Sequence, residues 1–371
     1  MKKTACVIVN RKELETELSI AKKIIAGKTH LAIISNVVLS FLPESMVIQG
    51  TNLEHAYLGV IGKPINRKFR VSADVPKVLV SLDRLMRVVK AIPKKTTEFP
   101  LEITWDGEGL KVNGTTTIVQ GGVYNDYPCL PKLPWGLSYN LLSYEKIDQV
   151  NGIPFNDDRR EHIRCLYVNG PAGHLVSTDG SRLYIVTIPK AADMKPFFLP
   201  KKTAAILTCS QLKAKIGAVR IDKLNAYIET GNGFISVRLP EGQFPDYGCI
   251  IPERDPVAVV STADKQDVID VMMEAAAILN DNYKGVVITG NGALTITATN
   301  PDSGEFQKDV SKDFTYAGAQ FEFALNQAFI IDACKSIQDK GVNMYVWGNE
   351  YPAVFESAGG DFKAVIMPMR Y

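Results

Sequence analysis

The chain has 371 residues, of which 46% are hydrophobic, 9% aromatic and 22% charged, a composition typical of globular proteins. At about 150 residues per domain, this length predicts two or three domains. The 42 basic and 40 acidic side chains nearly cancel, which excludes a generally polycationic nucleic-acid coat, and no apolar run approaches the ~18 residues of a membrane span. Six scattered cysteines without a CxxC pair, and four histidines without ligand spacing, predict no disulfide framework, no metal and a reducing cytosol.

The near-neutral total hides a charge gradient along the chain. Residues 1–125 carry a net charge of +7, residues 126–250 carry +3 and residues 251–371 carry −8. This gradient has two readings: an accident of the solvated surface, or a basic head that meets an acidic tail in the same chain or in a second copy.

One α+β pattern recurs three times along the chain. An amphipathic helix is followed by a strand pair that ends in Thr-Asn or Thr-Asp, then by a second helix and more strands. The first helices are expected at 14–27, 140–150 and 265–279, and the strand pairs at 36–52, 164–179 and 285–300. The second helices are expected to begin near Pro76, Pro200 and Ala324. Because Thr51, Thr178 and Thr299 are 127 and 121 residues apart, we predict three copies of one domain, over 1–126, 127–254 and 255–371.

Several glycine pairs have the sequence of hairpin turns. Gly231-Asn232-Gly233 and Gly290-Asn291-Gly292 each lie between two alternating strands, and Asp106-Gly107-Glu108-Gly109 is similar. None belongs to a GxGxxG motif after a strand or to a GxxxxGK[ST] motif, so the turn interpretation is preferred to a phosphate-binding loop.

Basic residues gather on the predicted second helix of the first copy. In a helix over 76–92, Lys77, Arg84, Arg87 and Lys90 lie opposite an apolar stripe, although Asp83 intrudes on the basic face. Lys28, Lys201 and Lys202 extend the pattern to other helices. A solvated charged face explains any one such helix, but recurrence on equivalent helices favours a surface that contacts phosphates without reading bases.

Three motifs together resemble the bacterial sliding clamp family, the beta subunit of the replicative DNA polymerase. They are Ser177-Thr178-Asp179-Gly180-Ser181-Arg182-Leu183, Glu241-Gly242-Gln243-Phe244-Pro245-Asp246-Tyr247 and Met367-Pro368-Met369-Arg370, with a weaker match at Thr51-Asn52-Leu53-Glu54. The resemblance spans the whole chain and implies a head-to-tail homodimer that closes into a ring, with helices inside and antiparallel sheets outside. It implies a non-catalytic processivity factor without a cofactor, which encircles double-stranded DNA of any sequence and tethers the polymerase, the clamp loader and repair proteins.

The resemblance also implies three sets of site residues. DNA contacts would come from Lys28, Arg84, Arg87, Lys90, Lys201 and Lys202. A groove for the linear motifs of partner proteins would be formed by Arg160, Ile163, Thr178, Gly180, Arg182, Leu183, Pro245, Ile250, Val365, Ile366, Met367, Pro368 and Met369. The dimer joint would bring Ile278 and Leu279 against a strand around Thr117 and Ile118. Ser181, Cys249 and Tyr371 depart from the family pattern at the groove, and the uncharged Thr115-Thr116-Thr117 departs from it at the joint.

Two other functions are compatible with parts of the sequence. Asp157, Asp158, Glu161 and Asp179 could gather as a metal-binding carboxylate cluster for phosphodiester hydrolysis, although Asp157-Asp158-Arg159-Arg160 is more simply a charged loop. A repeat scaffold that does not bind DNA is the second alternative.

Overall fold

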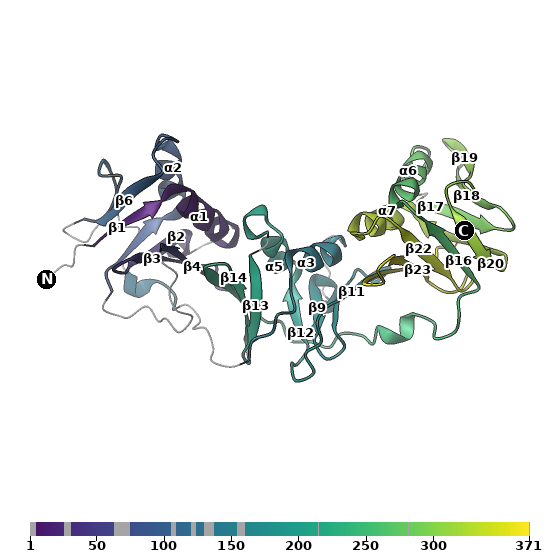
Figure 1. Ribbon diagram of the computed structural model, residues 1–371, viewed down its shortest axis with the longest axis horizontal. Coiled ribbons are helices and arrows are strands. Elements are labelled where there is room, and N and C mark those ends of the chain that lie inside the picture. The colour runs from purple at the N-terminus through teal and green to yellow at the C-terminus, as the bar shows by residue number, and fades with distance from the viewer. Residues whose placement is uncertain are drawn as a thin grey trace. The chain divides into compact units, whose positions relative to one another are not determined.

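The computed structural model describes residues 5–25, 31–62, 75–104, 109–119, 124–129, 137–153, 160–213, 215–280, 282 and 284–370. It is an α+β protein whose strands pair in antiparallel ladders, as the sequence predicts (Figure 1). Its contacts divide it into two compact units. The first comprises Met1–Tyr144 and Ile206–Leu239, and the second comprises Glu145–Ala205 and Pro240–Tyr371.

The first unit contains two sheets and two long helices. The four-stranded sheet has the order β1-β6-β7-β8, and the seven-stranded sheet has the order β13-β14-β15-β4-β3-β2-β5. The elements are β1 (Cys6–Asn10), α1 (Arg11–Ile25), β2 (Asn36–Phe41), β3 (Ser45–Thr51), β4 (His55–Gly62), β5 (Lys77–Ser81), α2 (Leu82–Ala91), β6 (Glu98–Ile103), β7 (Gly109–Val112), β8 (Thr116–Val119), β13 (Ile216–Ile221), β14 (Asn225–Thr230) and β15 (Gly233–Arg238).

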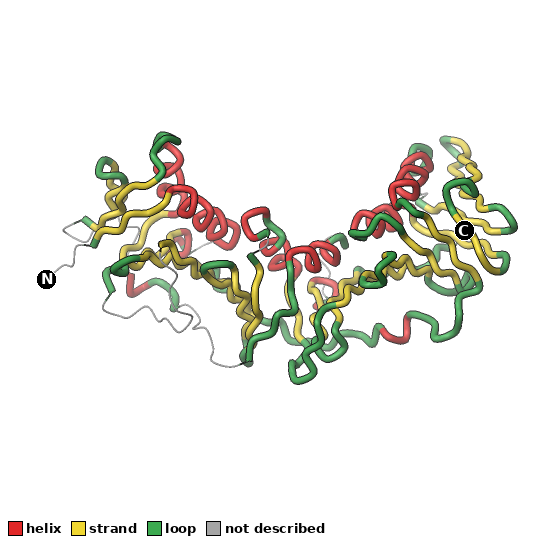
Figure 2. The backbone as a smooth tube through the Cα atoms, viewed as in Figure 1, coloured by secondary structure: helices red, strands yellow, loops and turns green. Residues whose placement is uncertain are grey.

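The described residues of the second unit also form two sheets, with the longer helices on one side of them (Figure 2). The nine-stranded sheet has the order β12-β9-β10-β11-β24-β23-β22-β16-β20, and the four-stranded sheet has the order β19-β18-β17-β21. The helices are α3 (Tyr144–Asn151), α4 (Glu161–Arg164), α5 (Lys201–Leu207), which continues across the division between the units, α6 (Lys265–Ala276) and α7 (Gln327–Ser336). The strands are β9 (Cys165–Asn169), β10 (His174–Thr178), β11 (Arg182–Thr187), β12 (Phe197–Pro200), β16 (Ala258–Thr262), β17 (Gly285–Gly290), β18 (Leu294–Asn300), β19 (Gly304–Asp309), β20 (Thr315–Gly318), β21 (Phe321–Asn326), β22 (Val342–Val346), β23 (Ala353–Ser357) and β24 (Phe362–Ile366).

Local sequence explains where three of the helices begin. The side chains of Ser81, Asp264 and Asn326 accept hydrogen bonds from backbone amides in the first turns of α2, α6 and α7. Such caps satisfy amide groups that have no partner inside the helix. The predicted hairpins at Gly231 and Gly292 are confirmed, and both glycines adopt the positive φ that these turns need.

The predicted helix start near Pro76 is wrong. Residues 77–81 form β5, which pairs with β2, and α2 begins only at Leu82. The apolar run Val78-Leu79-Val80 suits a strand that is buried on both faces, whereas Val78 together with Leu82 and Leu85 also suits a helical stripe. Pairing with β2 decides between them. Lys77 therefore does not belong to the basic helix face.

The two units do not coincide with the predicted boundaries at residues 126 and 254. In the first unit β15 pairs with β4, and in the second unit β11 pairs with β24, so each seven- or nine-stranded sheet combines strands from two predicted copies. Hydrogen bonds between these strands join each sheet across a predicted boundary, so the compact units follow the sheets rather than the single predicted copies. The threefold division thus stays a prediction.

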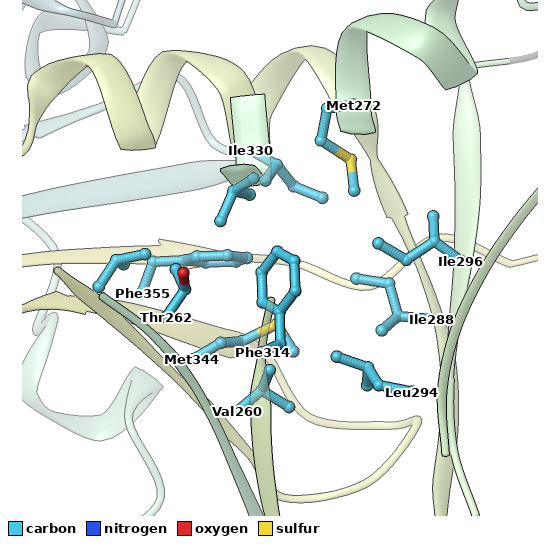
Figure 3. A pocket seen from close by; sticks show the side chains of 12 residues that line it. Val260, Thr262, Met272, Ile288, Leu294, Ile296, Phe314, Ile330, Met344 and Phe355 are labelled. Carbon is cyan, nitrogen blue, oxygen red and sulfur yellow. The ribbon is translucent and has the colours of Figure 1, made fainter. Parts of the chain in front are cut away.

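A small cavity lies inside the second unit, between α6, α7 and the two sheets (Figure 3). It measures about 30 Å³ and is lined by apolar side chains such as Met272, Ile288, Phe314 and Met344, with Thr262 as a polar exception. An enclosure of this size and character is a packing space in the core, too small for a substrate.

Candidate functional site

A tight turn joins β10 to β11 at the centre of the predicted partner groove. The hydroxyl of Thr178 donates to the carbonyl of Arg182 at 2.7 Å and accepts from the amide of Gly180 at 3.0 Å. Asp179 Oδ1 accepts from the amides of Ser181 and Arg182 at 3.0 and 3.1 Å. Gly180 has a φ of 93°, and a Cβ there would lie 3.8 Å from the Arg160 guanidinium and the Ile163 side chain. The turn therefore brings Thr178, Gly180 and Arg182 together, close to Arg160 and Ile163 at α4.

The same turn recurs in the first unit. Thr51 donates to the carbonyl of His55 at 2.7 Å and accepts from the amide of Leu53 at 3.0 Å, and Asn52 accepts from the amides of Glu54 and His55. Leu53 occupies the position of Gly180 and has a φ of 77°. The weak sequence match at Thr51-Asn52-Leu53-Glu54 thus corresponds to a shared hydrogen-bond pattern.

The C-terminal segment follows the turn. β24 pairs with β11 so that Ile366 lies opposite Arg182 and Val365 opposite Leu183. Beyond the strand, the amide of Met367 donates to the carbonyl of Ser181 at 3.1 Å. The amide of Met369 donates to the carbonyl of Ala324 at 2.8 Å. Met367 is 42% exposed, and Pro368 and Met369 are partly exposed.

The segment before β16 supplies a second wall. Phe244 stacks on Tyr167 with ring centroids 4.5 Å apart, and the Tyr247 hydroxyl lies 3.1 Å from Asn169 Nδ2 and 3.0 Å from His174 Nδ1. Ile250 packs against the same cluster, which includes Leu183 and Val365, while Pro245 is exposed. Burial, followed by the charges of Lys190 and Lys363, lowers the pKa of His174, so this histidine is neutral near pH 7.

The predicted groove residues thus divide by exposure. Ile163, Arg182, Leu183, Val365 and Ile366 are buried, whereas Arg160, Thr178, Gly180, Pro245, Ile250, Met367, Pro368 and Met369 are partly or fully exposed. The buried members can support a surface from beneath, and the exposed members can contact a partner directly.

Arg182 is held from two sides. Its Nε donates to Asp179 at 2.9 Å, its Nη1 donates to Asp332 on α7 at 2.8 Å, and its guanidinium carbon lies 4.2 Å from the ring centre of Phe329. The Arg182 side chain is only 3% exposed. Because one carboxylate partner lies on the turn and the other on α7, Arg182 joins β11 to α7. Sequence reasoning missed Asp332 and Phe329, since their distance along the chain carries no signal.

The predicted DNA contacts differ in exposure. Arg84, Arg87 and Lys90 are exposed on α2, opposite buried Leu85 and Val89, and Asp83 pairs with Lys22 at 2.9 Å. Lys202 is exposed on α5, and Lys28 lies outside the described residues.

Lys201 contradicts the prediction of a DNA contact. It is 2% exposed and its Nζ donates to the carbonyl of Thr178 at 3.3 Å. The helical wheel could not reveal this, because the burial arises from packing beside β9 and the turn.

The predicted dimer residues lie near two edge strands. β8 is at one edge of the first unit's four-stranded sheet and β19 at one edge of the second unit's. Thr117 is exposed and the side chain of Ile118 is buried, and the place of both residues in a dimer joint stays a prediction. On a strand with alternating faces, the exposed apolar side chain is that of Val119, the neighbour of Ile118, at 65%. Ile278 and Leu279 follow α6 and are partly exposed.

The alternative carboxylate cluster gains no support from the described residues. Asp157 and Asp158 lie outside them, and both oxygens of Asp179 accept hydrogen bonds from the turn or from Arg182. In the part of the chain that the structure describes, no group of three His, Cys, Asp or Glu side chains is arranged to hold a metal ion. No helix there is long and apolar enough to cross a membrane.

Residues 250–370 match the family model of the DNA polymerase III beta subunit, C-terminal domain. The beta sliding clamp of Pseudomonas aeruginosa is 24% identical over 378 residues, covering 98% of this chain and 99% of that protein. The beta sliding clamp of Escherichia coli is 22% identical with the same coverage. Residues 250–370 thus match one domain of the DNA polymerase III beta subunit, and nearly the whole chain is similar to beta sliding clamps.

The fold of this family extends over the whole chain. The crystal structure of the Pseudomonas aeruginosa DNA polymerase III beta subunit superposes with a TM-score of 0.82 at 23% identity, covering 99% of this chain and 100% of that one. The beta subunit of Thermotoga maritima gives a TM-score of 0.81 at 19% identity, with both chains covered completely. The predicted clamp fold is therefore confirmed.

Proposed function

We propose that this chain is a DNA sliding clamp: two copies close head to tail into a ring that surrounds duplex DNA and tethers a polymerase and repair proteins. The observation that carries this proposal is the similarity in fold over 99% of the chain to a DNA polymerase III beta subunit. The chain's role is topological and requires no catalysis. Its expected location is the cytoplasm, on the DNA.

The size of such a ring suits a duplex. Three domains per copy, each with two inner helices at ~9 Å spacing, give a circumference of roughly 110 Å and a bore of about 25 Å. Groove depths of about 8.5 and 7.5 Å imply a duplex about 20 Å wide, which leaves room for water. The threefold division at residues 126 and 254 is supported by the matching turns at Thr51 and Thr178.

The bore would carry few cations. Arg84, Arg87 and Lys90 on α2 and Lys202 on α5 are exposed and would contact phosphates weakly, because solvent and salt screen such contacts. Lys28 remains a proposed DNA contact, whereas Lys201 is not proposed as one because its side chain is buried. Weak contacts leave the duplex able to slide, while ring closure prevents its escape.

The dimer joint would pair β8 of one copy with β19 of the other. Both are edge strands whose outer backbone groups are available for pairing, and Val119, Ile278 and Leu279 offer apolar contacts. The net charge of +7 in residues 1–125 and −8 in residues 251–371 favours a head-to-tail arrangement over a head-to-head one.

Partner proteins would insert apolar and aromatic side chains of a linear motif between the Thr178–Arg182 turn, Pro245, Ile250 and the segment Met367–Met369. This groove would increase the local concentration of a polymerase on DNA by tethering it.

The test uses nicked circular DNA. The protein is loaded with a clamp loader and ATP, and the DNA is then linearised. We expect retention on circles, loss after linearisation, and retention again when both linear ends are blocked with bound streptavidin. Equal loss from circles and open linear DNA would refute the topological role.

A further inference from the structure

We infer that Lys201 is a positioning residue of the partner groove: its ammonium group holds the Thr178–Arg182 turn in place from behind. This inference rests on the proposed function of the groove. The evidence begins with the bond from Lys201 Nζ to the carbonyl of Thr178 at 3.3 Å. At 2% exposure the side chain has no access to a phosphate.

Comparison of the three repeats indicates that the fold itself does not need a charge at this position. Each repeat has a strand pair whose outer strand leads directly into a helix: Ser81 lies opposite Asn36, Pro200 opposite Cys165 and Asn326 opposite Gly285. The next residue, which begins the helix, is Leu82 in the first repeat, Lys201 in the second and Gln327 in the third.

The corresponding residue in the first repeat, Leu82, is buried at 3% exposure. An apolar side chain therefore fills the equivalent space without loss of the fold. The buried ammonium group occurs in the second repeat, which supplies the Thr178–Arg182 turn of the predicted groove, and this points to a role in the groove rather than in folding.

The turn that Lys201 holds connects the groove's parts. The carbonyl of Ser181 accepts a hydrogen bond from the amide of Met367, and Gly180 lies beside Arg160 and Ile163. A shift of the Thr178 carbonyl would consequently move both the turn that lines the groove and the C-terminal segment that is hydrogen-bonded to the turn. Because positioning tolerances at binding sites are small, such a shift weakens binding.

The surroundings of Lys201 make its charge sensitive to pH. Burial lowers its pKa to about 8, while Asp179 on the turn and Cys165 on β9 oppose this effect and Arg182 on β11 adds to it. Below this value the ammonium donates to Thr178; above it the group loses its charge. Charge-assisted hydrogen bonds are stronger than neutral ones, so the turn is held less firmly in alkaline solution.

The experiment compares Lys201→Met with the matched control Lys202→Met, whose target is the exposed neighbour. The probe is a ten-residue peptide with an N-terminal fluorescein and a C-terminal Leu-Phe, measured by fluorescence anisotropy with the full-length protein at pH 7. We expect Lys201→Met to weaken peptide binding about tenfold, as befits the loss of a charge-assisted hydrogen bond, and Lys202→Met to leave it unchanged. Equal binding by the wild type and Lys201→Met would overturn the inference alone, whereas failure of the wild type to bind would refute the groove itself.

Two further readouts separate positioning from a general loss of structure. The wild-type dissociation constant should rise as pH increases through about 8, and this step should be absent in Lys201→Met and present in Lys202→Met. The melting temperature of Lys201→Met should equal or exceed that of the wild type, because the substitution removes a buried charge. Should Lys201→Met fail to fold, Lys201→Leu, which copies the first repeat, takes its place. A pH step that persists in the folded variant would overturn the inference.

Discussion

The Asp179 and Asp332 carboxylates make unequal contributions to stability although both pair with Arg182. Asp179 accepts three hydrogen bonds, two from backbone amides of the turn and one from Arg182 Nε, and is largely buried. Asp332 accepts one and its side chain is 35% exposed. Asp179→Ala leaves two backbone amides and the Nε of Arg182 without their acceptor and should cost about 3 kcal/mol of unfolding free energy, although Asp332 remains beside Arg182. Asp332→Ala should cost about 1 kcal/mol, since solvent screens that pair and Asp179 remains beside Arg182.

The assay follows unfolding of the second unit by the fluorescence of Trp347. Trp105 and Trp135 are replaced by phenylalanine so that Trp347 alone reports. Urea titrations at pH 7 give the midpoint and slope for each variant, and equal slopes allow the free energies to be compared. A loss in Asp332→Ala as large as that in Asp179→Ala would refute the view that the turn's backbone amides, rather than the ion pair across to α7, dominate.

Three further outcomes follow from individual contacts. Leu53→Gly should raise the stability of the first unit by about 1 kcal/mol, because Leu53 is 57% exposed and its left-handed backbone, with a φ of 77°, is unfavourable for a residue with a Cβ. Thermal unfolding measures this change, and destabilisation would mean that the Leu53 side chain makes an important contact. Burial raises the pKa of Glu17 above its usual value of 4.5, although the hydrogen bond from the Tyr57 hydroxyl opposes this shift. The free energy of unfolding should therefore fall as pH rises from about 4.5 through the pKa of Glu17 in the folded protein. Glu17→Gln should flatten this slope in urea titrations from pH 4 to 8. Val119→Lys should weaken self-association at least tenfold in sedimentation experiments, while the same change at exposed Ile8 on the opposite edge strand should not; equal effects would argue against pairing through β8.

The sequence alone was sufficient to predict many of the strands and turns and the clamp fold. The alternation of apolar residues, the turn glycines and the recurrence of Thr51, Thr178 and Thr299 are local patterns, so hairpins such as β17–β18 could be predicted within a few residues. The motif at Ser177–Leu183 likewise identified the turn that gathers the groove residues.

Tertiary structure decided the features that depend on distant partners. Residues 77–81 suit a helix by periodicity and become a strand because β2 offers them backbone hydrogen bonds. Lys201 resembles Lys202 in sequence, yet packing beside β9 buries the first and exposes the second. Arg182 pairs with Asp332, which is 150 positions away along the chain, and no local pattern predicts this pair. Side-chain burial and long-range charge pairing depend on which surfaces the folded chain brings into contact, and those contacts exist only in three dimensions.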